Sequence, residues 1–195
     1  MKKLMSKIAL SILGVVSFFP SISYAHGGSG GGFMTGLAHP VLGFDHLLAM
    51  ASVGILSAQM GGKAIWKVPL TFVIVMLGGG IVGIKGVPLF SVELGIALSV
   101  LALGVAIALE NKLSPRWAMV FVGFFAIFHG HAHGTEMPSL SKPVFYACGF
   151  VLGTAGIHIA GVLIGIIADR IKDGKQMLRY LGAAVAGVGF HLIIG

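Results

Sequence analysis

The sequence contains little cysteine and little charge. Cys148 is the only cysteine, which excludes an intramolecular disulfide and any cluster of thiolate ligands. Charged residues make up 10% of the 195 positions and hydrophobic residues 56%, with a mean hydropathy of +1.00, whereas a typical soluble domain is about 25% charged. A soluble fold of this length cannot cover so much apolar surface. A soluble enzyme, a disordered chain and a nucleic-acid-binding protein are therefore excluded as first interpretations.

Residues 1–25 have the layout of a secretory signal peptide. A basic start precedes an apolar core of about a dozen residues, and Ser23 and Ala25 supply the small side chains of a cleavage site. We expect cleavage rather than retention as a membrane helix, because the core is short and Pro20 interrupts it. The mature chain then begins at His26 with a glycine-rich extracytoplasmic lead, residues 26–36.

Residues 37–195 are predicted to form an all-α membrane domain, a bundle of six transmembrane helices. The length of each apolar run is close to the roughly 20 residues that a helical span needs. Helices are expected because backbone groups in lipid must form hydrogen bonds within their own segment. Polar or proline-containing breaks separate the runs. The predicted spans are 37–59, 65–84, 89–109, 115–133, 143–168 and 177–194.

Basic side chains support one orientation of these spans in the bacterial cytoplasmic membrane. A cleaved signal peptide places the N-terminus outside, and six spans return the C-terminus to the outside. The breaks and helix ends that then face the cytoplasm hold eight Lys or Arg residues, against only Lys85 and Lys142 on the outer side. This distribution agrees with the positive-inside rule.

The first cluster of polar residues lies in span 1 and contains His39, Asp45 and His46. Pro40 suits the first turn of a helix. On a continuous helix, His39 and His46 are seven residues apart and lie within about 20° of one face. Asp45 lies about 100° from His46, where it either binds a metal from the side or orients a histidine ring. The alternative is a helix cap with buried polar packing.

The second cluster lies at the end of span 4 and contains His129, His131, His133 and Glu136. On a continuous helix, His129, His133 and Glu136 share a face and His131 points elsewhere. If the intervening glycines unwind the segment, all three histidines converge. Imidazoles and a carboxylate at this density indicate a site for a divalent metal. The alternative is an exposed histidine-rich loop; the zinc-protease pattern HExxH is absent.

The predicted topology brings the two clusters to the same depth near the outer face, where they could hold one ion together. His158 lies near the middle of span 5 and is either a deeper binding station or a buried, hydrogen-bonded histidine. The free α-amine and the imidazole of His26 would form a capture arm for the ion, with a disordered tail as the alternative.

Other features have structural interpretations. Trp66, Trp117, Tyr180 and Tyr146 fall at predicted span ends, as membrane-interface anchors do. Small residues at four-residue spacing in spans 5 and 6 predict close helix packing. These are Gly149 and Gly153, Gly161 and Gly165, and Gly182 and Ala186.

The two motifs, His39-Pro40-x-x-Gly43-x-Asp45-His46 and His129-Gly-His-Ala-His-Gly-x-Glu136, together resemble those of the HupE/UreJ family of bacterial membrane proteins. The resemblance covers essentially the whole mature chain. It implies a nickel permease, with cobalt transport also attributed to relatives, and an association with hydrogenase or urease maturation proteins. It also implies that His39, Asp45 and His46 are metal residues of span 1, with His129, His133 and Glu136 as their span 4 counterparts.

The expected function is secondary transport of a divalent transition metal ion rather than an enzymatic reaction. The ion is the substrate, and imidazole and carboxylate donors without thiolate suit Ni²⁺, Co²⁺ or Zn²⁺. The expected partners are this ion and the lipid bilayer, with no nucleic acid; a homo-oligomer stays open. One alternative is a membrane-embedded zinc hydrolase acting on lipid-like substrates, and another is a haem-binding redox protein.

Overall fold

The computed structural model describes residues 32–110, 113–137 and 142–195. The predicted signal peptide, His26 and residues 27–31 of the glycine-rich lead lie outside these ranges. The described residues form seven helices and contain no strand. The helices are α2 (Gly32–Leu42), α3 (Phe44–Met60), α4 (Ala64–Ile84), α5 (Val92–Ala108), α6 (Pro115–Thr135), α7 (Pro143–Arg170) and α8 (Gly174–Ile194).

The all-helical architecture of the described residues confirms the all-α part of the predicted fold class. By length and apolar composition, three of the described helices are able to cross a membrane: α4, α7 and α8. A fourth crossing results if the bent pair α2 and α3 counts as one span, and α5 is apolar but only 17 residues long. Large hydrophobic side chains remain exposed along these helices, including Ile74 on α4 and Leu163 on α7. This is the pattern of a bundle whose outer surface faces lipid rather than water.

The first predicted span is not one helix. It breaks at Gly43, and α2 and α3 meet at an angle of 83°, so the prediction that His39 and His46 share a helical face was wrong. Gly43 has an extended backbone. Because glycine has a low helix propensity, a break in the helix at this position costs little free energy. The Asp45 carboxylate accepts a hydrogen bond from the backbone N–H of His46 at 2.8 Å. This bond helps to satisfy the first turn of α3, where backbone donors have no partner within the helix.

Glycines bring the helices into backbone contact. A Cβ atom built on Gly149 would overlap Phe33 O of α2, and one built on Gly161 would overlap Ala51 O of α3. The same overlap with a neighbouring backbone occurs at Gly182, which faces α5. These contacts confirm the predicted packing role of the small-residue spacings in spans 5 and 6.

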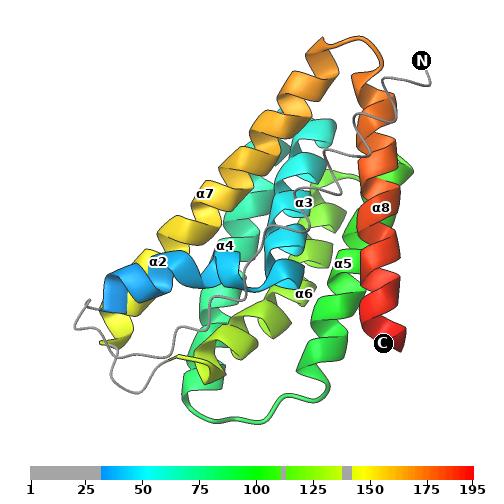
Figure 1. Cartoon of the computed structure of the whole chain (residues 1–195). Coiled ribbons are helices and arrows are strands. Elements are labelled where there is room, and N and C mark those ends of the chain that lie inside the picture. Colours follow the sequence, from blue (N-terminus) through cyan, green and yellow to red (C-terminus); the bar gives the residue numbers. More distant parts are fainter. Residues whose placement is uncertain (1–31, 111–112, 138–141) are drawn as a thin grey trace.

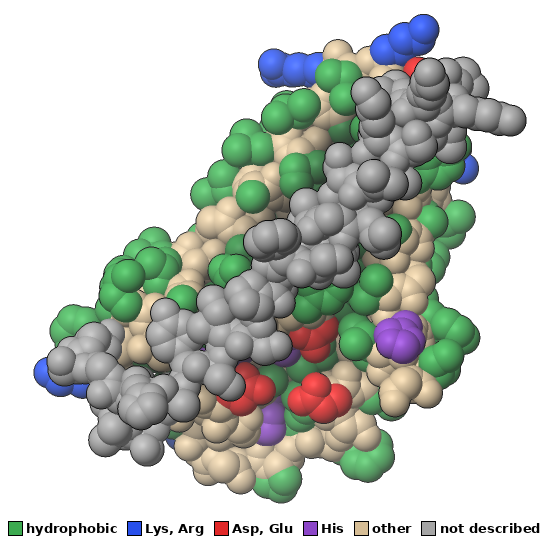
Figure 2. Space-filling view, in the orientation of Figure 1, with side chains coloured by type: hydrophobic (Ala, Val, Ile, Leu, Met, Phe, Trp, Pro, Cys, Tyr) green, Lys and Arg blue, Asp and Glu red, His purple; other side chains and the backbone are tan. Residues whose placement is uncertain are grey.

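The helix ends sort into two levels (Figure 1). The turn between α7 and α8 lies at the top of the view, and the connection between α4 and α5 and the C-terminus lie at the bottom. Helix α2, the start of α3 and the end of α6 also lie toward the bottom. In Figure 2, acidic and histidine side chains gather at this lower end, whereas Lys and Arg side chains show around the α7–α8 turn, where Arg170, Lys172 and Lys175 are exposed.

Candidate metal centre

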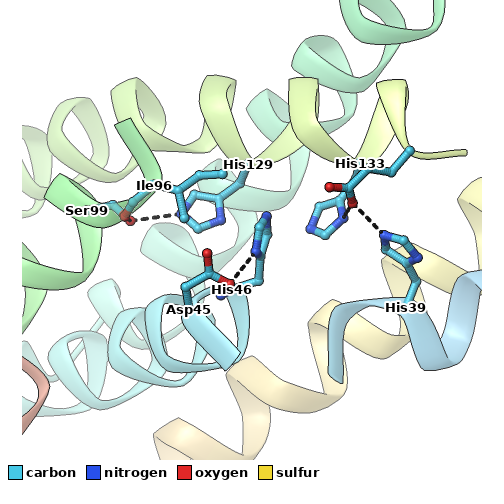
Figure 3. Close-up of polar contacts among 8 residues, drawn as sticks. His39, Asp45, His46, Ile96, Ser99, His129 and His133 are labelled. Carbon is cyan, nitrogen blue, oxygen red and sulfur yellow. Dashed lines mark hydrogen bonds and ion pairs between the residues drawn. The ribbon is translucent and has the colours of Figure 1, made fainter. Parts of the chain in front are cut away.

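Six of the residues singled out in the sequence come together at the lower end of the bundle (Figure 3). Helix α2 contributes His39, the first turn of α3 contributes Asp45 and His46, and the last two turns of α6 contribute His129 and His133. Glu136 follows directly after α6. The two clusters, about 90 residues apart in sequence, thus form one site.

His39, His133 and Glu136 form the tightest group. One ligand atom from each lies within 4.8 Å of the other two. His39 Nε2 is 3.1 Å from Glu136 Oε2, and His133 Nδ1 is 3.8 Å from the same oxygen. Metal–nitrogen and metal–oxygen bonds of about 2.0–2.2 Å hold neighbouring ligand atoms about 3 Å apart. Small side-chain movements would therefore close this group around an ion.

The hydrogen bond with His39 is the main cause that lowers the pKa of Glu136. The carboxylate is therefore ionised at neutral pH. It supplies negative charge that a divalent cation needs, at the rim of a site whose other donors are imidazoles.

Asp45 orients His46. Its Oδ1 lies 2.8 Å from His46 Nδ1, so Nδ1–H donates to the carboxylate and Nε2 keeps its lone pair. His46 Nε2 is buried and has no hydrogen-bond partner among the described residues. The His46 ring lies between two others, with ring centroids 4.3 Å from His133 and 4.9 Å from His129. The hydrogen-bonded Asp45 and His46 form the kind of carboxylate–histidine pair that commonly orients a metal ligand.

Ser99 of α5 fixes the tautomer of His129. The Ser99 hydroxyl donates to Ile96 O at 2.6 Å, and Ser99 Oγ lies 2.8 Å from His129 Nε2. The single hydroxyl proton is already used, so His129 Nε2–H must be the donor to Ser99. His129 Nδ1 then carries the lone pair, and it is buried without a partner in the described chain. The sequence did not reveal this residue, because its role depends on packing between α5 and α6.

The assignment of His129 to a candidate metal site predicts that Ser99→Ala weakens binding of a divalent metal ion, probed with Ni²⁺, about tenfold, because loss of an outer partner of a metal-binding histidine typically costs 10–100-fold in affinity. Calorimetric titration of the detergent-solubilised protein measures the change. Ser57→Ala is the matched control, since Ser57 is also buried and also donates to the carbonyl three residues before it, at 2.8 Å. Equal affinities for the two variants would contradict the assigned role of Ser99.

His131 is not brought into this group. Helix α6 is continuous through Thr135, and His131 Nε2 donates to Val87 O at 2.7 Å, which directs it toward the α4–α5 connection. The alternative in which the glycines unwind the segment was therefore wrong. Gly130 and Gly134 instead pack against the α4 backbone, where a Cβ on either would overlap a carbonyl oxygen.

His158 is 2% exposed and also lies outside the tight group. The rings of His158 and Phe72 are in edge contact, with their centroids 5.3 Å apart. Phe72 also contacts His129, at a centroid distance of 5.5 Å. Neither ring nitrogen of His158 has a hydrogen-bond partner among the described residues. His158 is therefore buried, as one alternative expected, but the hydrogen bond that this alternative also expected is absent among the described residues.

Two aromatic residues of α7 complete the wall of the site. Tyr146, expected as a membrane-interface anchor, is instead 4% exposed, with its ring 5.7 Å from His39. Phe150 lies 4.4 Å from the ring of His133 and is stacked on Tyr146. The prediction that Tyr146 is a membrane-interface anchor was therefore wrong. Although Tyr146 is near a span end, its side chain is buried by contact with α2. Their four-residue spacing on one helix face was the sequence signal for this wall.

Comparison with known proteins agrees with the two motifs. The model of the family described as HupE / UreJ protein matches residues 14–192. Protein HupE of Rhizobium leguminosarum bv. viciae is 44% identical over 192 residues, which cover 97% of this chain and 98% of that protein. No solved structure matches. The length of these matches and the convergence of both motifs on one site establish that the chain belongs to the HupE/UreJ family.

Proposed function

We propose that the protein is a permease for a divalent transition metal ion, with Ni²⁺ as the preferred substrate and Co²⁺ as the nearest competitor. The observation that carries this proposal is the convergence of His39, His133 and Glu136, with His46 and His129 adjacent, inside a strongly apolar helical bundle. Ionisable groups at membrane depth are costly and usually mark an ion pathway. Several buried imidazole nitrogens, which have no hydrogen-bond partner within the described ranges, supply the donors that such an ion requires.

The composition of the site favours Ni²⁺, Co²⁺ or Zn²⁺ as cargo. Imidazole and carboxylate ligands suit these ions, whereas Cu⁺ prefers thiolate and thioether ligands. The lone cysteine, Cys148, is exposed on α7. Family membership adds nickel and cobalt to this chemical argument as the preferred metals.

We further propose six membrane spans with the metal centre on the outer side. The helical segments follow the six predicted apolar runs, with α2 and α3 together forming the first. The metal centre lies at the opposite end from the basic α7–α8 turn, as the positive-inside rule requires of an outer site. A cleaved signal peptide and insertion into the cytoplasmic membrane complete this arrangement.

The membrane potential is sufficient to drive such uptake. Inward movement of a divalent ion yields about 4.6 kcal/mol per 100 mV, inside negative, from about 2.3 kcal/mol for each charge. That free energy corresponds to more than about three decades of concentration ratio. A separate ATP-driven step is therefore unnecessary.

Uptake into proteoliposomes tests the proposal directly. The purified chain is reconstituted, a potassium diffusion potential is imposed, and entry of Ni²⁺, Co²⁺ and Zn²⁺ is followed separately. We expect Ni²⁺ entry to exceed that of the other two ions and to rise with an inside-negative potential. Entry no faster than in vesicles without protein, for all three metals, would refute the proposed function.

A further inference from the structure

A buried stripe of four residues runs along α7 away from the metal centre. Tyr146, Phe150, Thr154 and His158 follow one another at four-residue spacing and are each between 0% and 4% exposed. Residues four apart lie one above the other on a helix face. The first two contact His39 and His133. The stripe therefore continues inward from the metal centre, and His158 lies about 18 Å along the helix axis from Tyr146.

The far end of the stripe contains polar atoms with no partner. Both nitrogens of His158 and the hydroxyl of Thr154 are buried without a hydrogen bond among the described residues. Leaving such a group without a hydrogen bond destabilises the folded protein. The groove beside His158, between α4 and α7, supplies no hydrogen-bond partner for these atoms, because the other described residues that line it, such as Leu70 and Ile159, are apolar. A transient ligand would account for these atoms.

Aromatic and imidazole rings connect the metal centre to this position in short steps. Ring centroids are 4.3 Å apart from His133 to His46 and 4.9 Å apart from His46 to His129. The next steps are 5.5 Å from His129 to Phe72 and 5.3 Å from Phe72 to His158. Phe72 is fully buried and its ring contacts both His129 and His158, so it lies between the outer donors and the inner one. An ion that moves past Phe72 meets His158 as its next nitrogen donor.

We infer that His158, with Thr154 one turn before it, is a second binding position that receives the divalent metal ion on the inner side of Phe72. This inference rests on the proposed function and adds to it a step in the pathway. One imidazole and one hydroxyl make a weak site. Weak binding suits a transit position, from which the ion has to leave again.

The test separates binding at the outer centre from passage through the protein. His158→Leu removes the nitrogen donors while keeping the side-chain volume similar. We expect Ni²⁺ affinity at the outer centre, measured by calorimetry, to stay within about twofold of the wild-type protein, and uptake into proteoliposomes to fall at least about tenfold, as for loss of other metal-supporting groups. His191→Leu, at an exposed histidine of α8, is the matched control and should transport normally.

The outcomes distinguish this inference from the proposed function. Normal uptake by His158→Leu, together with active wild-type protein, would overturn the second position and leave the permease intact. Wild-type vesicles that take up no metal would refute both.

A second pair of variants decides the matter if His158→Leu also loses outer binding and is therefore misfolded. The variants His158→Cys and His158→Ser introduce side chains of nearly the same shape, but only the cysteine thiolate is a strong ligand for Ni²⁺. The inference requires several-fold faster uptake by the cysteine variant. Equal uptake by the two variants would overturn it.

Discussion

Replacement of His133 by alanine is expected to reduce Ni²⁺ uptake to the level of vesicles without protein. His133 is 4% exposed and stands at the middle of the site, within the group formed with His39 and Glu136 and beside the ring of His46. Both of its ring nitrogens are buried without a hydrogen bond in the described chain, so truncation breaks no hydrogen bond. Loss of a direct ligand should cost at least the 10–100-fold in affinity that loss of an outer partner costs.

The measurement is Ni²⁺ binding by calorimetry together with uptake into proteoliposomes, on protein shown by its circular dichroism to be fully helical. His191→Ala is the control, because it also removes an imidazole from an apolar helix but lies exposed on α8. Uptake by His133→Ala within about twofold of His191→Ala would show that the cluster is not the transport site, since removal of a ligand has a larger effect.

Most helix positions were predictable because apolar runs and their breaks determine them. The predicted fourth span, 115–133, corresponds to α6, and the predicted fifth, 143–168, corresponds to α7. In both, proline at the first helical position marks the start. The bend between α2 and α3 was not predictable from hydropathy, because the apolar run continues through Gly43. Backbone conformation there depends on the Asp45–His46 bond and on contact with α7.

That the two polar clusters come together was predictable from the sequence, but the contacts of the individual residues were not. Histidine and carboxylate composition identifies the donors, and the topology predicts their common depth. Spacing predicts a shared face only where the helix is continuous, which holds for His129 and His133 but fails for His39 and His46. The contact of Ser99 with His129 arises from packing between α5 and α6, about which a local sequence pattern contains no information.

Gly130→Ala is expected to destabilise the protein and to weaken Ni²⁺ binding, although it removes no ligand. A Cβ at Gly130 would overlap Met76 O of α4 and lie 2.9 Å from Gly80 N. These are backbone atoms, so the new methyl group cannot be accommodated by a side-chain rotation. Overpacking of this kind costs about 1–3 kcal/mol. The strain is relieved when α6 moves away from α4, and that movement displaces His129, which precedes Gly130 directly.

Gly78→Ala provides a control on the same pair of helices. A Cβ at Gly78 meets no atom of the described residues within 4 Å, although a Cβ at the next residue, Gly79, would lie 2.5 Å from Ile127 O. Alanine at an open helix position should stabilise the protein by about 0.5–1 kcal/mol. For Gly78→Ala, the thermal unfolding temperature in detergent should therefore rise slightly and the Ni²⁺ affinity should stay unchanged. For Gly130→Ala, both should fall. Normal Ni²⁺ affinity in a destabilised Gly130→Ala protein would mean that close packing of α4 on α6 supports the fold but does not position the metal ligands.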